Sequence, residues 1–299
     1  MAKAGEFRFE EFAVSDEHSG PYGIATGRDH GLWVTLVHAG AIARVAADGG
    51  RVTLYPLDAP TCKPSIITAG PDGALWFTRL GDHRIGRITT AGELGGFGLP
   101  PGGSGPFGIS AGADGALWFT EMNADRIGRI TGDGGITEFP LPRTGMFPSM
   151  IVQGPDDALW FTLNQANALG RISLAGEISI FPLPTADAAP VGMTCADGAV
   201  WFVEIGAGQV GRLSVQDGSI REFPLPDRAS RPHAIVAAPS GGCWFTEWKG
   251  NCVGYIAPDG DVTEYALPAS ESEPHGLALG PDGAVWVALE AGGVARLTV

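Results

Sequence analysis

Hydrophobic and polar positions recur along this chain as short apolar runs separated by turns rich in glycine, aspartate and proline. Each copy of the pattern opens on a proline, and these prolines are Pro21, Pro64, Pro106, Pro148, Pro190, Pro232 and Pro274. The first spacing is 43 residues and the others are 42. A tryptophan follows each proline by twelve residues, or by eleven in the fifth copy. So regular a repeat predicts one array of similar units rather than several independent domains.

Each copy contains four apolar runs of strand length, and Asp-Gly turns commonly join the first two. Examples are Asp72-Gly73, Asp114-Gly115 and Asp282-Gly283, which predict tight hairpins. A third run, such as residues 127–130, and a fourth, such as 137–142, complete the unit. Four short antiparallel strands with a period near 42 residues are typical of a propeller blade. We therefore predict an all-β, seven-bladed β-propeller that forms a single domain over residues 1–299.

The two ends of the chain complement one another. The last copy stops after its third run, at residues 294–299, and so lacks a fourth strand. Residues 11–14 resemble a fourth run, and Phe12 precedes Pro21 by nine residues, as Phe139 precedes Pro148. We expect the N-terminal strand to complete the last blade, because this pairing closes the ring and removes an exposed sheet edge.

Composition narrows the possible partners and compartment. The net charge of -14 and the pI near 4.7 disfavour nucleic acid and anionic membranes, which attract basic surfaces. Four cysteines without CxxC spacing are interpreted as small buried apolar residues in a reducing compartment. The N-terminus lacks an apolar signal core, and no apolar run reaches about 18 residues. We expect a cytoplasmic monomer with no membrane or nucleic-acid partner.

Residues present in nearly every copy are interpreted as structural. The tryptophans are Trp33, Trp76, Trp118, Trp160, Trp201, Trp244 and Trp286, and the matching arginines are Arg44, Arg87, Arg129, Arg171, Arg212 and Arg296. A residue required in every blade most simply serves packing or hydrogen bonding. Function is therefore expected where the repeat is broken.

The clearest break follows the opening proline. In chain order the residues there are Tyr22, Ser65, Phe107, Ser149, Val191, His233 and His275. The start of a first strand and the end of the second lie at the same end of their hairpin. We therefore expect Glu273 and His275 to lie near Glu290, and His233 near Trp248. Ring closure brings Tyr22 beside them.

Two carboxylates and an imidazole permit metal chemistry at this rim. Neighbouring carboxylates repel one another unless a cation or proton is shared, and Mg²⁺ favours carboxylate oxygens with several retained waters. The structural alternative is that Glu273 and Glu290 are solvated rim charges, with His233 and His275 bonded to backbone. The other histidines, His18, His30, His38 and His83, are interpreted as surface or turn residues.

The blade pattern, with Pro-His-Ala at Pro232, Glu-Pro-His-Gly at Glu273 and a carboxylate at Glu290, resembles the streptogramin B (virginiamycin B) lyases over the full chain. The resemblance implies that Glu273 and Glu290 hold Mg²⁺ and that His275 is the general base. It also implies that His233, Trp248 and Tyr22 contact the substrate. The implied reaction confers antibiotic resistance by linearising a small cyclic depsipeptide through β-elimination at its threonine ester. A histidine suits the base role, since its ordinary pKa lies near neutrality.

Two other functions remain open from the residues. A metal-dependent propeller hydrolase, such as a lactonase, would use a carboxylate-bound ion to activate water. A non-catalytic propeller would hold a ligand on the same face and release it unchanged. The mass of the product distinguishes these possibilities, because hydrolysis adds one water and elimination adds none.

Overall fold

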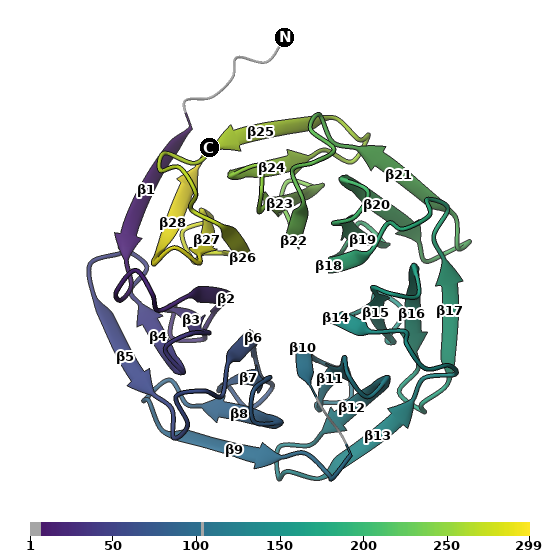
Figure 1. Cartoon of the computed structure of the whole chain (residues 1–299), viewed down its shortest axis with the longest axis horizontal. Coiled ribbons are helices and arrows are strands. Elements are labelled where there is room, and N and C mark those ends of the chain that lie inside the picture. The colour runs from purple at the N-terminus through teal and green to yellow at the C-terminus, as the bar shows by residue number, and fades with distance from the viewer. Residues whose placement is uncertain (1–6, 103–104) are drawn as a thin grey trace.

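The computed structural model describes residues 7–102 and 105–299, which form seven four-stranded antiparallel sheets arranged around a central axis (Figure 1). This arrangement confirms the predicted seven-bladed β-propeller. In each blade the first strand of the repeat lies at the centre of the ring and the fourth at its outer edge. The described residues contain no helix, and hence none long and apolar enough to cross a bilayer.

Each blade contributes one strand to each of four positions between the axis and the outer edge. The innermost strands are β2 (Pro21–Thr26), β6 (Pro64–Ala69), β10 (Pro106–Ala111), β14 (Pro148–Gln153), β18 (Pro190–Ala196), β22 (Pro232–Ala237) and β26 (Pro274–Leu279). The second strands are β3 (Leu32–Leu36), β7 (Leu75–Arg79), β11 (Leu117–Glu121), β15 (Leu159–Leu163), β19 (Ala199–Glu204), β23 (Cys243–Glu247) and β27 (Val285–Leu289).

The third strands are β4 (Ala41–Val45), β8 (Arg84–Ile88), β12 (Arg126–Ile130), β16 (Ala168–Ile172), β20 (Gln209–Ser214), β24 (Cys252–Ile256) and β28 (Gly293–Thr298). The outer strands are β5 (Val52–Pro56), β9 (Leu94–Gly98), β13 (Ile136–Pro140), β17 (Ile178–Pro182), β21 (Ile220–Pro224), β25 (Val262–Ala266) and β1 (Arg8–Ala13).

The two ends of the chain share one blade, as predicted. Strand β1 pairs antiparallel with β28, and the seventh sheet has the order β1-β28-β27-β26. Figure 1 shows β1 at the outer edge of this blade, beside the C-terminal strand. Glu10 lies opposite Arg296 in the register, and their side chains form an ion pair at 2.6 Å. The ring is therefore closed by hydrogen bonds and side-chain contacts between strands from opposite ends of the chain.

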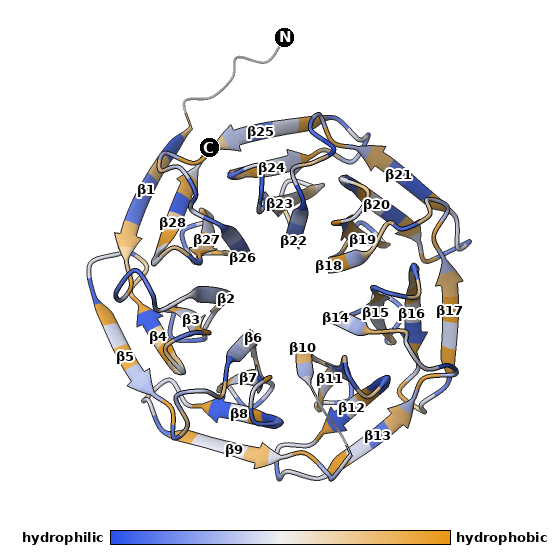
Figure 2. Cartoon of the chain, viewed as in Figure 1, coloured by the Kyte–Doolittle hydropathy of each residue, from blue (hydrophilic) through white to orange (hydrophobic). Residues whose placement is uncertain are grey.

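The core lies mainly between neighbouring blades and includes the repeated tryptophans. Trp118 is fully buried and stacks on Phe139 of the outer strand, with ring centroids 5.5 Å apart. Strand β11, like the other second strands, is almost entirely buried, whereas outer strands such as β13 alternate partly buried and exposed positions. Figure 2 shows the corresponding hydropathy pattern, with hydrophilic patches on β4, β8, β12 and β16.

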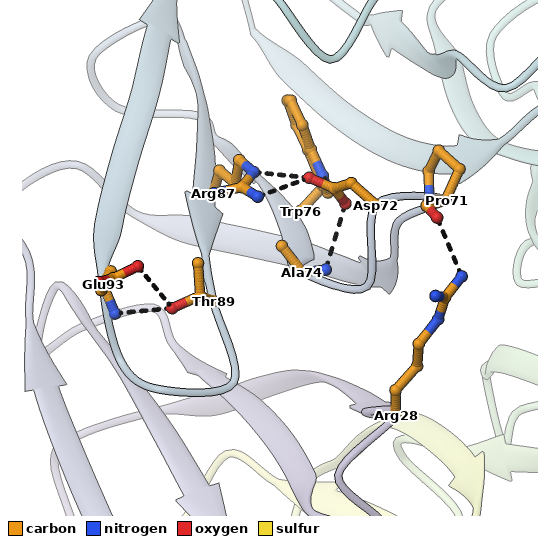
Figure 3. Close-up of polar contacts among 8 residues, drawn as sticks. All are labelled: Arg28, Pro71, Asp72, Ala74, Trp76, Arg87, Thr89 and Glu93. Atoms are coloured by element: carbon orange, nitrogen blue, oxygen red, sulfur yellow. Dashed lines mark hydrogen bonds and ion pairs between the residues drawn. The ribbon is translucent and has the colours of Figure 1, made fainter.

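These patches include the repeated arginines, and the second blade shows their role (Figure 3). Asp72 Oδ1 accepts a hydrogen bond from Trp76 Nε1 at 3.0 Å, and Asp72 Oδ2 accepts one from Arg87 Nε at 2.7 Å. The same Asp-Trp-Arg unit forms in the first, third and fourth blades. This confirms the structural interpretation of these residues, because the aspartate fixes both partners within one blade. The last three blades depart from it: Trp201 Nε1 and Trp286 Nε1 have no hydrogen-bond partner among the described residues, and the sixth blade has Ser240 and Tyr255 at the acidic and basic positions.

Threonine hydroxyls on the second strands bond neighbouring blades to one another. Thr120 Oγ1 donates to the Ser149 carbonyl of the next blade at 2.5 Å, and Thr246 Oγ1 donates to the His275 carbonyl at 2.7 Å. The acceptor in each case is the residue after the opening proline. Blade packing therefore positions the backbone of the variable residues.

The cysteines are not paired with one another. Cys62, Cys243 and Cys252 are buried, as expected for small apolar residues, and all four cysteines are free thiols. Cys195 is only partly buried, although it packs against the core cluster that includes Trp160 and Met193.

Candidate active site

The innermost strands begin with a β-bulge that carries the variable residue. The pairing register shifts between Pro21 and Ile24, between Pro232 and Ile235, and between Pro274 and Leu277. A bulge redirects a side chain relative to a regular ladder. The bulges of the first, sixth and seventh blades carry Tyr22, His233 and His275 respectively.

Glycine permits the close approach of the seventh and first blades at this point. A Cβ atom on Gly276 would collide with the main-chain oxygen of Tyr22. The absence of a side chain there lets the two strands converge, so that Tyr22 and His275 can pack against one another.

The three bulge residues form one aromatic cluster. The ring centroids of Tyr22 and His275 lie 4.5 Å apart, and those of His233 and His275 are also 4.5 Å apart in a T-shaped arrangement. The Tyr22 hydroxyl lies 3.3 Å from His233 Nε2. Trp248 is also close, with its ring centroid 6.4 Å from that of His275. The rings of Tyr22, His233 and Trp248 therefore lie around His275, close together as the sequence predicts.

Glu290 links His275 to a histidine of the first blade. Glu290 Oε2 forms a close ion-pair contact with Nε2 of the His275 imidazole, and His275 is only 7% exposed. Glu290 Oε1 lies 2.8 Å from Nε2 of His38. Because each imidazole faces a different oxygen, the carboxylate is held from both sides.

Glu273 occupies the predicted place, but its side chain makes none of the expected contacts. The Glu290 amide donates to the Glu273 carbonyl at 3.1 Å, so the two backbones are adjacent. The Glu273 backbone adopts a left-handed conformation, with φ of 51°, and the residue is exposed. Its carboxylate forms no hydrogen bond or ion pair with the described part of the chain. The expected convergence of two carboxylates on His275 is thus met by Glu290 alone.

Burial controls the protonation of the cluster. Desolvation, followed by repulsion from the Glu290 charge, raises the pKa of Tyr22 well above its usual range. Desolvation and the nearby His275 lower the pKa of His233 to about 3. The His275 hydrogen bond lowers the pKa of Glu290, with a further contribution from His38. At neutral pH the phenol and His233 are therefore neutral, and Glu290 is ionised.

These charge states bear on the hydrogen bonds of the cluster. The Tyr22 hydroxyl and His233 Nε2 share one hydrogen bond, in which the phenol donates when His233 carries its proton on Nδ1 and accepts when the proton is on Nε2. The Glu290 carboxylate faces His275 Nε2, so a single proton held on Nε2 would leave Nδ1 of His275 with a lone pair. Nδ1 of His233, Nδ1 of His275 and Trp248 Nε1 are buried and have no hydrogen-bond partner among the residues that the structure describes, and His275 Nε2 has only the ion-pair contact with Glu290. The site thus offers several buried polar nitrogen atoms to a ligand.

A cavity of about 650 Å³ opens beside this cluster, between the innermost strands. Tyr22 and His233 belong to its lining, which is mostly apolar, whereas His275, Glu290 and Trp248 lie behind them and do not line it. A mostly apolar cavity with a few polar groups at one edge is the usual form of a small-molecule site.

Carboxylate oxygens are ligands that Mg²⁺ prefers, and the two acidic residues at this rim are Glu273 and Glu290. Over residues 7–102 and 105–299, no three His, Cys, Asp or Glu side chains converge in a way that would enclose a metal ion. Mg²⁺ is often bound by only one or two carboxylates, with water completing its octahedron. Glu273 is exposed to solvent and is joined to Glu290 through the backbone, so these residues fit an open site of that kind.

His38 is the residue that the sequence interpretation missed. It is a surface residue, with 53% of its side chain exposed, but it is not remote from the cluster. The signal in the sequence was its position just beyond β3, because the first blade meets the seventh when the ring closes. His18 and His30 are exposed, as expected, and His83 accepts a hydrogen bond from the Gly105 amide at 3.2 Å in a loop.

A known protein family matches this chain over nearly its whole length, and curated members match shorter stretches. The family model described as the virginiamycin B lyase family matches residues 7–297. A curated virginiamycin B lyase of Streptomyces coelicolor is 55% identical over 95 residues, which are 31% of this chain and 31% of that protein. That alignment therefore spans about a third of the curated relative.

Solved structures match almost the whole of this chain. A streptogramin B lyase structure superposes with a TM-score of 0.94 at 42% identity, covering 98% of this chain and 97% of the other. A catalytically inactive virginiamycin B lyase from Staphylococcus aureus with quinupristin, in which alanine replaces a histidine, also gives a TM-score of 0.94. It is 41% identical and covers 98% of this chain and 100% of the other.

Proposed function

The chain belongs to the virginiamycin B lyase family, and we propose that it linearises streptogramin B antibiotics by β-elimination at their threonine ester, which would confer resistance. The proposal rests mainly on His275. Its imidazole is buried near the cavity, Glu290 faces its Nε2 atom, and its Nδ1 atom has no hydrogen-bond partner among the described residues. The inactive histidine-to-alanine relative with quinupristin supports both the ligand class and a histidine base.

His275 acts as the general base in this mechanism. Its Nδ1 lone pair takes the proton from the threonyl α-carbon, and the C–H electron pair becomes the new double bond to the β-carbon. The bond between the β-carbon and the ester oxygen breaks, and its electrons leave with the carboxylate. Glu290 stabilises the imidazolium that forms, because its carboxylate already faces Nε2. No water enters the product.

The neighbouring residues orient the substrate. Trp248 Nε1 is a buried donor, which suits it to a substrate carbonyl group, and His233 Nδ1 would be a second donor when the Tyr22 hydroxyl donates to His233 Nε2. Tyr22 also packs its ring against His275. The apolar lining of the cavity fits the hydrophobic parts of a cyclic depsipeptide.

We also propose that the reaction requires a magnesium ion, which Glu273 and Glu290 would hold. When bound, the ion would stabilise negative charge on the substrate carbonyl beside the reacting carbon. The monomeric state and the cytoplasmic location also remain proposals, and they rest on sequence composition.

Mass spectrometry of quinupristin incubated with the protein and Mg²⁺ tests the function. We expect a linear product with the mass of the substrate. A product heavier by one water would identify a metal-dependent hydrolase such as a lactonase. Substrate that is bound and recovered unchanged would identify a non-catalytic binding propeller.

A further inference from the structure

His38 lies on the first blade, just beyond β3, and contacts the last blade across the ring closure. Its Nε2 atom is 2.8 Å from Glu290 Oε1, although 252 residues separate the two in sequence. The second oxygen of the same carboxylate faces His275. The three side chains therefore form a continuous imidazole-carboxylate-imidazole chain.

The backbone around His38 fixes its position despite the exposure of its ring. The His38 amide donates to the Ser19 carbonyl at 3.1 Å, and the Val37 amide donates to the Gly20 carbonyl at 2.8 Å. Gly20 has a left-handed backbone, with φ of 67°, and a Cβ atom there would collide with the His38 ring. The same left-handed residue and backbone bonds recur in other blades, as at Arg231 and Glu273, so the repeat fixes the His38 backbone, and glycine at position 20 leaves room for the imidazole.

We propose that His38 is a positioning residue, whose Nε2–H holds Glu290 Oε1 so that Glu290 Oε2 faces His275 Nε2. The inference rests on the proposed function, in which Nδ1 of His275 is the base. A carboxylate bonded on one side alone can rotate, and Glu290 is partly exposed to solvent that would compete for it. With His38 in place the rotation is blocked, and His275 keeps its proton on Nε2. The role requires only a proton on His38 Nε2, which can then donate to Glu290 Oε1.

Substitutions of His38, with His18 as a control, distinguish a role in positioning Glu290 from a role in folding. His38→Ala removes the donor, whereas His38→Gln retains an N–H at similar reach. His18 is a matched control, because it lies in the connection before β2 and 86% of its side chain is exposed. Its ring lies 3.6 Å from the carboxylate of Glu17, which is also exposed, and its amide bonds to Asp16. His18→Ala should leave both activity and stability unchanged.

Kinetics with quinupristin give the first readout. Removal of a residue that orients a catalytic carboxylate typically costs about 10-fold or more, so His38→Ala should lower kcat by about 10-fold with KM nearly unchanged. His38→Gln should recover most of this loss. An unchanged kcat in His38→Ala, or no recovery in His38→Gln, would overturn the proposal, provided that melting curves show both variants folded.

Nitrogen NMR of histidine-labelled protein gives a second readout that needs no turnover. The protonated and unprotonated nitrogens of a neutral imidazole have well separated ¹⁵N shifts, and the His275 signals can be assigned by their loss in His275→Gln. We expect a single Nε2–H tautomer in the parent and in His38→Gln, and averaged tautomers in His38→Ala. The same single tautomer in His38→Ala would overturn the role of His38. A parent protein that shows the expected NMR pattern but does not convert quinupristin would overturn the proposed function instead.

Discussion

The hydroxyl oxygen of Tyr22 lies 3.3 Å from Nε2 of His233, although 211 residues separate them in the chain. Tyr22 belongs to the first blade and His233 to the sixth, so the contact reaches across the start of the seventh, where His275 packs against both. The site can form only when the ring is closed. Pairing of β1 with β28 is therefore a condition for function as well as for stability.

Burial of neutral His233 predicts a specific dependence of stability on pH. The pKa of this residue is about 3 in the folded protein and near its ordinary 6.5 when unfolded. Between these values the unfolded chain binds the extra proton, so the free energy of unfolding falls as the pH falls from 6.5 towards 3. One such proton contributes a slope of about 1.4 kcal/mol per pH unit.

Urea denaturation at several pH values checks this prediction with His233→Gln as the comparison. The variant lacks the titrating group, so its stability should decline less steeply over the same range. Parallel curves for the two proteins would contradict neutral burial of His233.

Most of the fold could be predicted from the sequence, because each copy of the repeat gives the same evidence for the same four-stranded blade. The opening prolines and the tryptophans mark equivalent positions in seven blades, and Phe12 revealed that the N-terminal strand completes the last one. The exceptions are local. Tyr255 stands in place of the repeated arginine in the sixth blade and bonds to the Gly241 carbonyl at 2.8 Å, which the repeat alone does not predict.

The site was predictable where a residue breaks the repeat at a known register. His233 and His275 follow the opening proline, and the hairpin register places Glu290 beside His275. The exposure of the Glu273 side chain was not evident from residue types, because the residue before the opening proline is left-handed in every copy whatever its side chain, as at Lys63, Arg231 and Glu273. His38 was missed for a related reason, since its contact depends on how two loops from opposite ends of the chain meet.

Truncating a repeated tryptophan should cost stability rather than binding. Trp118 is fully buried, stacks on Phe139 and donates to Asp114 at 3.2 Å. Loss of a buried aromatic typically costs about 3–5 kcal/mol, which chemical denaturation of Trp118→Ala should reveal. A Trp118→Ala protein that unfolds like the parent would contradict this packing.

Trp248→Ala should have the opposite effect. Trp248 is partly buried and lies beside His275 rather than in the blade core. We expect near-parental stability but weaker binding of quinupristin, measured by calorimetry in the catalytically disabled His275→Ala background. An unchanged Kd would remove Trp248 from the substrate site.

Chelation should abolish turnover and leave the fold intact. Glu273 and Glu290 lie at the rim, whereas the core consists of apolar contacts that need no ion. EDTA-treated protein should therefore keep its circular dichroism spectrum and melting curve, and added Mg²⁺ should restore activity. Full activity in a sample verified to be free of metal would exclude the proposed ligand role of the two carboxylates.

Replacing His275 should remove ring opening while preserving substrate binding. General-base removal typically costs about 10²- to 10⁴-fold in rate, and the loss should fall on kcat because Tyr22, His233 and Trp248 remain in the site. His275→Gln fills a similar volume and can still bond to Glu290, but it has no basic nitrogen, so it should be as inactive as His275→Ala. Deuterium at the threonyl α-carbon should slow the parent if proton transfer limits the rate. Near-parental turnover by either variant would assign the base to another group, since neither can accept the α-proton.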